Sequence, residues 1–466
     1  MKLSLKYGEG SISFDIPQKA LSGPVIRPRK EVKQEYKGKS LEEIIEDAIL
    51  NPFNRDKLPK LVENKVVGLV VSDEWRAGLH QKIIEGMLEG ISKGKPREVR
   101  LFCACGTHDP KVYSKNIRAW ADQAAEDLKI PNYSFYANDC DRSEFIYLGD
   151  TKRNTKVWIE KPWMETEVRL YGHEAKFHYM AGYSCVDKQV IPGLAKRITV
   201  EMNHKHSLDH KHSVRGMNAW HPDPKRRSNP FNLDAKDARK LTESCILKNG
   251  KLVKEKPRTF SLDMISDPAN IYWIESGDPD LVSTHVIQAV DKQSMFRVKK
   301  QKYVIVSPGG PPASQALYGT QNCFDMALKG GILDGGEALI TAPLDGRPDL
   351  PEEVRGIAPD IKSKRLFYDS LVRMRDWPLE RATKFIDENF ELYLWKTDRV
   401  LKLLKENRTK LYFYCELEAE KLERAGLSKA ESLQDWIDER IERSDGLFTV
   451  IDDGNKIAVL GEDEGA

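Results

Sequence analysis

The chain has 466 residues, enough for two or three domains that each bury their own core. Its 74 basic and 72 acidic residues nearly cancel, so no charge bias indicates a nucleic acid or an anionic membrane as a partner. There is no apolar run near the roughly 18 residues of a membrane-spanning helix, no signal-peptide pattern and no even set of cysteines, so we expect a cytoplasmic protein with reduced thiols.

Short runs rich in Val and Ile alternate with helical patterns, which indicates an α/β fold. A capping box at Ser40 and Glu43 predicts the start of an early helix. The predicted strands cover residues 65–71, 99–105, 133–137, 168–171, 303–306, 337–341 and 411–414. The predicted helices cover about 78–91, 114–128, 234–241, 281–290 and 314–327. Two final runs, 447–451 and 456–460, are predicted to form a hairpin. We expect two α/β domains, 1–270 and 271–466.

Polar side chains follow two predicted strands of the first domain. Asp73 and Arg76 come after the first strand, and His108 comes after the second. In open parallel sheets, ligands bind beyond the carboxyl ends of the strands. We therefore expect these side chains to meet the segment that starts at His173, which follows the fourth strand, at one edge of one sheet.

Six of the ten histidines lie between His173 and His212, in a stretch that also contains Lys188. Lys188 has small and apolar neighbours, and a buried lysine can serve as a nucleophile or form a Schiff base. Histidine suits proton transfer or metal binding near neutral pH. Each residue also has an alternative without a catalytic role. The stem of Lys188 could be buried while its amine reaches water. His108 could be a turn histidine and Arg76 a surface arginine, and the later histidines could belong to a solvated basic loop.

Two common types of site are poorly supported by the sequence. There is no G-x-G-x-x-G fingerprint, and the turn at 309–312 is not followed by the G-K-[ST] of a Walker loop. Cys103 and Cys105 lie in a strand pattern whose alternation puts both thiols on one face. This favours a buried core over a metal site.

Together these residues resemble the lactate racemase family, whose members use a nickel-pincer nucleotide. The likeness rests on an ordered set of motifs between about residues 65 and 330. The motifs are the Asp73…Arg76 loop, His108 in G-T-H-x-P, His178 and Lys188 around A-G-Y-S, the I-P-G segment, His204 sixteen residues after the lysine, the Ser228-Asn229-Pro230 turn, Gly277-Asp278-Pro279, and a G-G-P-x-x-x-Q run ending at Gln315.

The resemblance implies a cofactor derived from nicotinate mononucleotide (pyridinium-3-thioamide-5-thiocarboxylic acid mononucleotide), whose two thiocarbonyl arms hold nickel. Lys188 would tether it as a thioamide, and His204 would complete a square-planar nickel site. His108 and His178 would be the paired acid and base, and Arg76 would hold the substrate carboxylate. The other residues implied to line the cofactor site are Asp73 and Gln315. The active site would lie in the cleft between two domains with Rossmann-like parallel sheets.

The implied activity is that of an isomerase, a racemase or epimerase that inverts C2 of a 2-hydroxy acid. Hydride would pass from C2 to the cofactor while one histidine takes the hydroxyl proton. Hydride would then return to the opposite face of the bound keto acid, with the other histidine assisting. Proteins that synthesise and insert the cofactor would be partners, whereas nucleic acid and membrane would not.

The sequence departs from the family pattern at several positions. Trp75 and Ala77 replace the threonine and proline of D-x-T-R-P, and Tyr318 stands where lactate-active members have lysine. The His-rich loop 205–228 is longer than the family suggests. Its side chains that could line a larger pocket are Arg215, Asn218 and Trp220. We therefore hypothesise a substrate larger than lactate, either an aldonic sugar acid or malate.

Four alternatives stay open. They are a lactate racemase proper, a Lys188 Schiff-base enzyme acting on keto acids, a zinc hydrolase using three histidines of the loop, and a metal-storage protein without activity. The three possible zinc ligands are His204, His206 and His210. Apart from His204, we interpret the later histidines, including His212, as loop residues, and His173 as structural.

Overall fold

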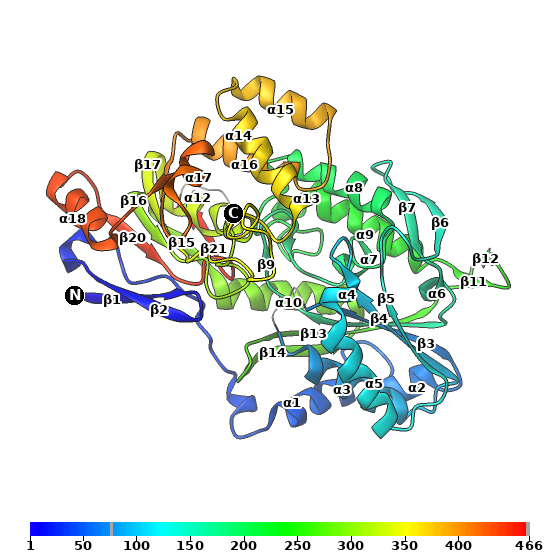
Figure 1. Cartoon of the computed structure of the whole chain (residues 1–466). Coiled ribbons are helices and arrows are strands. Elements are labelled where there is room, and N and C mark those ends of the chain that lie inside the picture. Colours follow the sequence, from blue (N-terminus) through cyan, green and yellow to red (C-terminus); the bar gives the residue numbers. More distant parts are fainter. Residues whose placement is uncertain (75–77, 463–466) are drawn as a thin grey trace.

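A computed structural model describes residues 1–74 and 78–462 of the chain. Two sheets of mainly parallel strands, each with helices on its faces, form the frame of this α/β protein (Figure 1). Within these described ranges, no helix is both long and apolar enough to cross a membrane.

The first sheet has six strands in the order β14-β13-β8-β3-β4-β5. Neighbouring strands are parallel except for β13 and β14. The strands are β3 (Val66–Ser72), β4 (Glu98–Ala104), β5 (Tyr133–Ala137), β8 (Val168–Glu174), β13 (Arg258–Ser266) and β14 (Ile271–Gly277). The sheet thus continues past residue 270, because the antiparallel strand β14 completes its edge.

Helices bury both faces of the first sheet, so β3 is apolar along almost its whole length. Val67, Leu69 and Val71 face one helical layer, whereas Val70 faces the other. The first layer contains α1 (Leu41–Leu50), α2 (Leu58–Val62), α3 (His80–Ser92) and α5 (Lys115–Asp127). The second layer contains α6 (Lys161–Met164), α9 (Pro230–Thr242) and α10 (Pro279–Ser294). The predicted capping box of α1 is confirmed.

The second sheet has five parallel strands in the order β19-β18-β17-β16-β20. They are β16 (Gln301–Val306), β17 (Ile332–Thr341), β18 (Lys410–Tyr414), β19 (Ser428–Lys429) and β20 (Phe448–Ile451). The helices that pack with it are a π-helical segment (Arg365–Asp369), α14 (Ser370–Met374), α15 (Leu379–Glu388), α16 (Leu394–Lys405), α17 (Ala419–Arg424) and α18 (Leu433–Arg443). The short helix α13 (Ile361–Lys364) precedes this π-helical segment.

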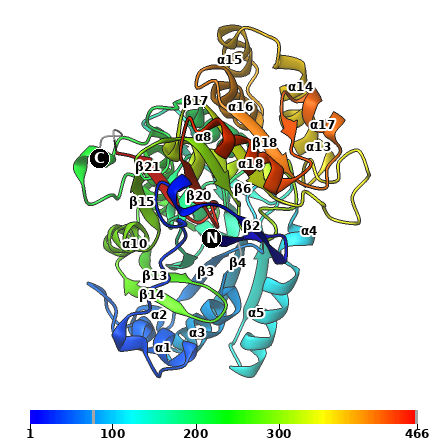
Figure 2. The same cartoon turned by 90° about the vertical axis from the view of Figure 1, so that its left-hand side faces the viewer.

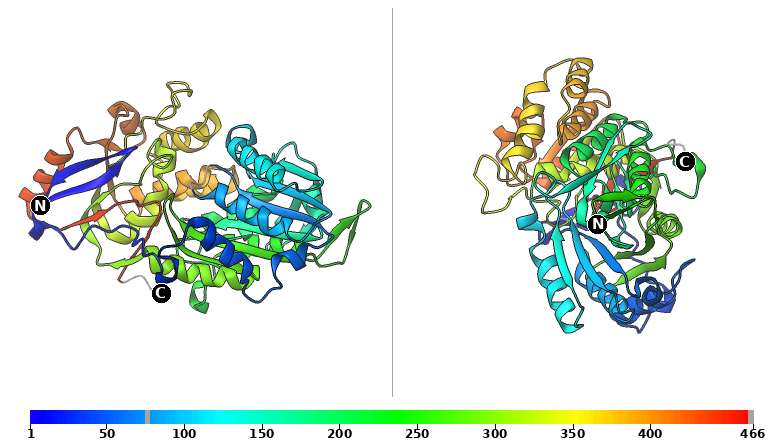
Figure 3. Two further views of the ribbon diagram at one scale, coloured as in Figure 1. Left: turned by 90° about the horizontal axis from the view of Figure 1, so that it is seen from below. Right: turned by 90° about the vertical axis from the view of Figure 1, so that its right-hand side faces the viewer.

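The N-terminal segment packs on this second sheet, whose strands come about 300 residues or more later in the sequence (Figures 2 and 3). The hairpin of β1 (Lys2–Tyr7) and β2 (Gly10–Asp15) buries Leu5 and Phe14 against strands β16 and β20. Beyond the hairpin, Leu21 and Ile26 form isolated bridges to the edge strand β20. The two ends of the chain therefore share one hydrophobic core.

The predicted closing hairpin is wrong. Strand β20 pairs in parallel with β16, and β21 (Ala458–Gly461) pairs in parallel with β15 (Met295–Val298). The turn between them packs against another loop, because Gly454 N–H donates to the Ser307 carbonyl at 2.8 Å. Partners distant in sequence thus outcompete the local pairing that the pattern predicted.

The helix predicted for 314–327 is confirmed only in part, because helical structure begins at Leu317 and changes type along the segment. The chain instead forms α11 (Leu317–Thr320), a π-helical segment (Phe324–Leu328) and α12 (Lys329–Gly331). The N–H groups of Leu317 and Tyr318 donate to the carbonyls of Gly356 and Ile357, both at 3.0 Å. Tertiary hydrogen bonds therefore replace the first predicted helical turn. Single-turn π-helices are frequent at functional sites.

Small elements complete the molecule. The two-stranded sheets are β6 (Phe145–Asp150) with β7 (Lys156–Glu160), β9 (Phe177–His178) with β10 (Gly182–Tyr183), and β11 (Ile246–Lys248) with β12 (Lys251–Val253). Three short helices are α4 (Pro110–Tyr113), α7 (Asp187–Val190) and α8 (Arg197–Lys205). Helices α7 and α8 carry Lys188 and His204 respectively.

Candidate functional site

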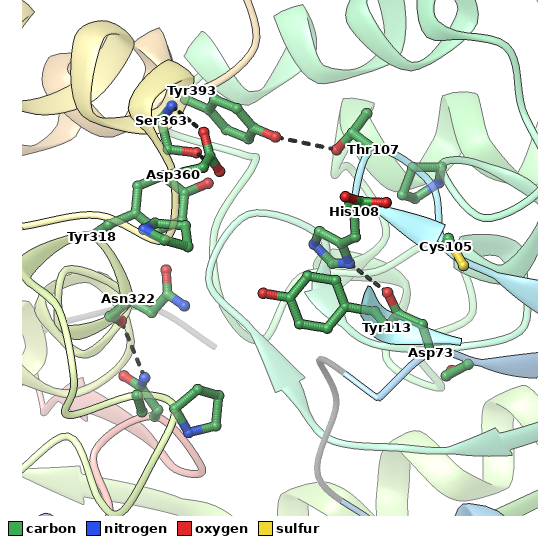
Figure 4. Close-up of a pocket in the computed structure, with 18 of the residues that line it drawn as sticks. Asp73, Cys105, Thr107, His108, Tyr113, Tyr318, Asn322, Asp360, Ser363 and Tyr393 are labelled. Atoms are coloured by element: carbon green, nitrogen blue, oxygen red, sulfur yellow. Dashed lines mark hydrogen bonds and ion pairs between the residues drawn. The ribbon is translucent and has the colours of Figure 1, made fainter. Parts of the chain in front are cut away.

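A cavity of about 1080 Å³ lies where segments that follow the two sheets meet (Figure 4). One wall is formed beyond the carboxyl ends of β3, β4 and β5, as open parallel sheets predict. The opposite wall is formed by the loop before α11, by the π-helical segment Phe324–Leu328 and by the start of α16. From the first wall come Asp73, His108, His178, Lys188 and His204, and from the second come Tyr318, Asn322, Trp395 and Lys396.

His108 is paired with a buried carboxylate on the first wall. Its Nδ1 lies 2.6 Å from Oδ2 of Asp73, which is only 1% exposed (Figure 4). A carboxylate only accepts hydrogen bonds, so Nδ1 carries the proton and Nε2 has the lone pair in the neutral ring. The pairing follows from the fold, because the two residues come just after the adjacent strands β3 and β4. Asp73 thus orients His108 as a proton acceptor.

His178 has the opposite arrangement. Its Nδ1 accepts hydrogen bonds from the backbone N–H groups of Met180 and Ala181, at 3.3 and 3.2 Å. The proton of the neutral ring therefore resides on Nε2. The ring also stacks on Tyr179, with centroids 4.7 Å apart and planes tilted by 20°. In this conformation His108 can accept a proton, whereas His178 can donate a hydrogen bond.

Lys188 and His204 lie around one aromatic ring. Lys188 Nζ is 5.9 Å from the centroid of Phe231, and the His204 ring centroid is 5.0 Å from it. Both residues line the cavity, yet their exposed fractions are only 4% and 6%. His204 Nδ1 donates to the Val200 carbonyl at 2.8 Å, which leaves the lone pair on Nε2. Burial, followed by the charge of Lys188, lowers the pKa of His204 to about 3, so the ring is neutral at physiological pH.

A buried ionic network holds the helix that carries Lys188. Arg239, which is fully buried on α9, donates to Asp187 at 2.6 Å, to Glu243 at 2.6 Å and to Asp280 at 2.7 Å. These carboxylates raise the pKa of Arg239 well above its ordinary value, although burial alone lowers it. Because Asp187 precedes Lys188, the network fixes the position of the lysine backbone.

We expect Arg239→Met to destabilise the protein by about 3–5 kcal/mol, because it leaves buried carboxylates without their cation. Urea denaturation followed by circular dichroism measures the loss. Lys240→Met is the matched control, since Lys240 pairs with Glu243 and Asp280 but is 42% exposed. Such an exposed pair contributes at most about 1 kcal/mol. Equal losses in the two variants would contradict the role given to Arg239.

Close backbone contacts also constrain this segment. A Cβ atom on Gly193 would lie 2.1 Å from the Gln189 carbonyl oxygen, on the helix that carries Lys188. The Gln189 side chain donates in turn to the carbonyls of Val70 and Gly172, at 3.2 and 2.6 Å. The helix that carries Lys188 and the I-P-G segment after it are therefore fitted against the two central strands of the first sheet, β3 and β8.

Arg76 and Gln315, both assigned to the site from the sequence, have different outcomes. Arg76, with its neighbours Trp75 and Ala77, falls outside the described residues. Gln315 is half-buried in the turn before α11, where its carbonyl accepts from Gly346 N–H at 2.9 Å, and it is not among the described residues that line the cavity.

The other histidines of the stretch pair with separate carboxylates. The pairs are His173 with Asp263 (3.1 Å), His206 with Asp234 (3.8 Å), His210 with Asp398, and His212 with Asp209 (3.0 Å). Among the described residues, no three His, Cys, Asp or Glu side chains are grouped as a metal site would require. Burial lowers the pKa of His210 to about 4, so this loop is not simply a solvated basic patch. The thiols of Cys103 and Cys105 are buried, as predicted.

The loop 205–228 does not supply the larger pocket that we expected from Arg215, Asn218 and Trp220. Arg215 Nε donates to the Val459 carbonyl at 2.9 Å, and Asn218 donates to the Ala181 carbonyl at 3.2 Å. Trp220 Nε1 donates to Asp187 at 2.7 Å. None of the three is among the described residues lining the cavity, because each secures the loop to its supporting elements.

The sequence analysis missed Lys396 and its aromatic neighbours. Lys396 lies in the first turn of α16, is 2% exposed and lines the cavity. The adjacent Trp395 donates through Nε1 to the Tyr179 hydroxyl at 2.9 Å, and its ring centroid is 5.2 Å from that of His204. The only signal in the sequence was a lysine within an apolar helical pattern, which is typical of many surface helices.

Known proteins resemble this chain in sequence and in fold. The family model described as the lactate racemase N-terminal domain matches residues 7–216. The lactate racemase of Thermoanaerobacterium thermosaccharolyticum is 24% identical over 347 residues, which cover 73% of this chain and 74% of that protein. The lactate racemase of Lactiplantibacillus plantarum is 21% identical over 221 residues, which cover 47% of this chain and 50% of that protein.

Solved structures extend the similarity to nearly the whole chain. The lactate racemase apoprotein of T. thermosaccharolyticum superposes with a TM-score of 0.78 at 21% identity, covering 98% of this chain and 100% of that one. A Thermotoga maritima protein gives a TM-score of 0.62 at 14% identity, covering 90% and 98%. These likenesses show that the fold is shared along the second half of the chain as well.

Proposed function

We propose that the chain is a member of the lactate racemase family, and that it is a racemase or epimerase that inverts C2 of a 2-hydroxy acid. The observation that carries the proposal is the arrangement of the cavity. His108, His178, Lys188 and His204 come from separate segments and all line it. We further propose that two α/β domains, built on the two sheets, enclose this site.

The residues present fit the nickel-pincer nucleotide. Lys188 presents an amine with little exposure to water, as a covalent tether requires. His204 presents a neutral imidazole whose other nitrogen is held by the Val200 carbonyl, an arrangement typical of metal-ligating histidines. Nitrogen and sulfur ligands in a planar arrangement suit nickel(II). The chemistry that this group supplies when bound is acceptance of hydride from C2 and its return.

His108 and His178 would have different roles in the transfer of the hydroxyl proton. His108, oriented by Asp73, accepts the proton from a substrate hydroxyl at Nε2. His178 donates a hydrogen bond from Nε2 to the carbonyl oxygen of the keto acid. To act as the base for the opposite enantiomer, His178 must release its long contacts to the Met180 and Ala181 N–H groups. Proton transfer of this kind contributes roughly 10²–10⁴-fold to the rate.

We propose a substrate larger than lactate, either malate or an aldonic sugar acid. The volume of the cavity, about 1080 Å³, supports this proposal, since it leaves space beside a bound mononucleotide. Tyr318 lines the cavity at the position where lactate-active relatives carry lysine, which also favours a different substrate. A panel of 2-hydroxy acids, followed by chiral chromatography, tests this. Lactate as the best substrate by far would contradict it and favour the lactate racemase proper.

One experiment separates the proposed class from its rivals. The chain is co-produced with the proteins that synthesise and insert the cofactor, which we propose as its partners, and its intact mass, nickel content and absorption spectrum are recorded. An adduct on Lys188 with one nickel per chain is the expected result. If borohydride instead traps a keto acid on Lys188 in metal-free protein, the chain is a Schiff-base enzyme.

A further inference from the structure

Lys396 places a buried cation in the wall of the cavity, opposite the first sheet. Its side chain lies between two aromatic rings, with Nζ 4.2 Å from the centroid of Tyr318 and 5.1 Å from that of Tyr179. Tyr179 in turn stacks on His178. One aromatic ring therefore separates the ammonium group from a histidine of the proposed acid/base pair.

The direct partners of the Lys396 ammonium are neutral. Nζ donates to the Tyr318 carbonyl at 2.9 Å, to Gln321 Oε1 at 3.1 Å and to Asn322 Oδ1 at 2.7 Å. Among the described residues, no carboxylate forms an ion pair with it. A buried cation held only by dipoles is costly, because no counter-ion offsets its desolvation.

Asp325, the buried carboxylate whose charge acts on Lys396, is already occupied. It accepts from Lys329 at 2.7 Å, from Arg399 at 3.2 Å and from Gln321 at 2.8 Å. Gln321 thus stands between Asp325 and the lysine. Lys329 and Arg399 already pair with Asp325, so this carboxylate does not serve as the ion-pair partner of Lys396.

We propose that Lys396 and Asn322 form an anion subsite that holds a carboxylate of the substrate, and that binding there takes up a proton. Asn322 is only half-buried, lines the cavity and can release Nζ towards a ligand. A carboxylate would supply the counter-ion that the protein does not provide. The identity of the anion as a substrate carboxylate rests on the proposed function, whereas the subsite itself does not.

The pH dependence of binding follows from the surroundings of Lys396. Burial lowers its pKa to about 7, Asp325 acts in the opposite direction, and Arg399 lowers it further. The other ionisable groups facing it are Cys323, Tyr179 and Tyr318. Below pH 7 the amine is already charged and binds a carboxylate directly. Above pH 7 binding must first restore the proton, so affinity falls with rising pH, by up to tenfold per unit.

Isothermal titration of the full-length chain tests the subsite without requiring catalysis. Lactate, malate and uncharged lactamide are titrated at pH 6, 7 and 8, in two buffers of different ionisation enthalpy. The wild type is expected to take up a proton with a carboxylate at pH 8 and to bind it more weakly than at pH 6. Lys396→Met removes this uptake and weakens carboxylate binding at pH 6 at least tenfold, while lactamide binding is unchanged.

Two further variants make the result specific. Lys396→Arg keeps a positive charge at every pH tested, so the fall in carboxylate affinity that Lys396 causes between pH 6 and 8 should disappear. Lys405→Met removes a lysine from the last turn of the same helix, where Nζ donates to the Trp377 carbonyl, and binding is expected to stay as in the wild type. His108 and His178 also line the cavity, and proton uptake due to them would persist in Lys396→Met.

The ligands distinguish which carboxylate is held. If Lys396→Met weakens lactate and malate equally, the subsite holds the reacting carboxylate; if it weakens malate alone, the subsite holds a second carboxylate. Absence of carboxylate binding in the folded wild type, or unaltered proton uptake in Lys396→Met, overturns the proposal. If the chain is co-produced with the proteins that synthesise the cofactor and still carries no adduct on Lys188, but its carboxylate binding depends on Lys396, the subsite is retained and the proposed function is rejected.

Discussion

Replacing Lys188 by alanine is expected to abolish turnover and the covalent adduct together. The proposed tether is a covalent bond between Lys188 and the cofactor. Without it, the cofactor would be held by non-covalent contacts alone and would be lost on purification. Intact mass spectrometry reads the adduct, elemental analysis reads nickel, and chiral chromatography reads turnover. Because Lys188 is buried beside Phe231, Lys188→Arg keeps a cation there but is expected to fail equally.

A nearby lysine provides the control for this experiment. Lys196 precedes α8 and lies over the Trp158 ring, with Nζ 5.1 Å from its centroid, and it is not among the described residues lining the cavity. Lys196→Ala should therefore retain the adduct and full turnover. Racemisation by Lys188→Ala at more than a trace of the wild-type rate would refute the tether.

Substitution of either histidine by glutamine is expected to lower turnover by about 10²–10⁴-fold, the usual contribution of a general acid or base. Enantiomers have equal free energies, so for a true racemisation kcat/KM must fall equally in both directions. The steady state therefore cannot tell which enantiomer each histidine serves. Single-turnover formation of the keto acid can: His108→Gln should fail with one enantiomer and His178→Gln with the other.

The conformation of the rings makes this prediction sharper. His108 is held as an acceptor by Asp73 at 2.6 Å, whereas the contacts of His178 to the main chain are longer than 3 Å. We expect Asp73→Asn to impair the enantiomer served by His108 and to spare the other. His212→Gln is the control, because His212 is half-buried, pairs with Asp209 and is not among the described residues that line the cavity. Equal loss of both half-reactions in each variant would mean that the histidines act as one unit.

Local patterns predicted the elements of the first sheet well. The predicted strand 133–137 coincides with β5, and the capping box at Ser40 begins α1 as expected. Such elements are specified by apolar periodicity and by side chains a few residues apart, so they can be read from one stretch of chain. The final hairpin was wrong, and the helix predicted for 314–327 lacks its first turn, because the competing hydrogen-bond partners lie far away in the sequence.

The candidate site shows the same division. His108, His178, Lys188 and His204 were identified by the spacing of motifs, and all four line one cavity. Spacing did not reveal that Asp73 is the partner of His108, because that pairing depends on β3 and β4 being neighbours. Nor did it reveal that the loop residues proposed for a larger pocket are engaged elsewhere.

By itself, the sequence determined the α/β class and most strands of the two sheets, and it picked out four residues, His108, His178, Lys188 and His204, that line one cavity. Only the tertiary structure decided how the two chain ends share a core and which charges are left without a counter-ion. Lys396 is the clearest case, since its acceptors lie more than 70 residues earlier in the chain. Whether a side chain is buried, and whether its charge has a counter-ion, depends on contacts between segments that are distant in the sequence. A local sequence pattern does not predict these contacts.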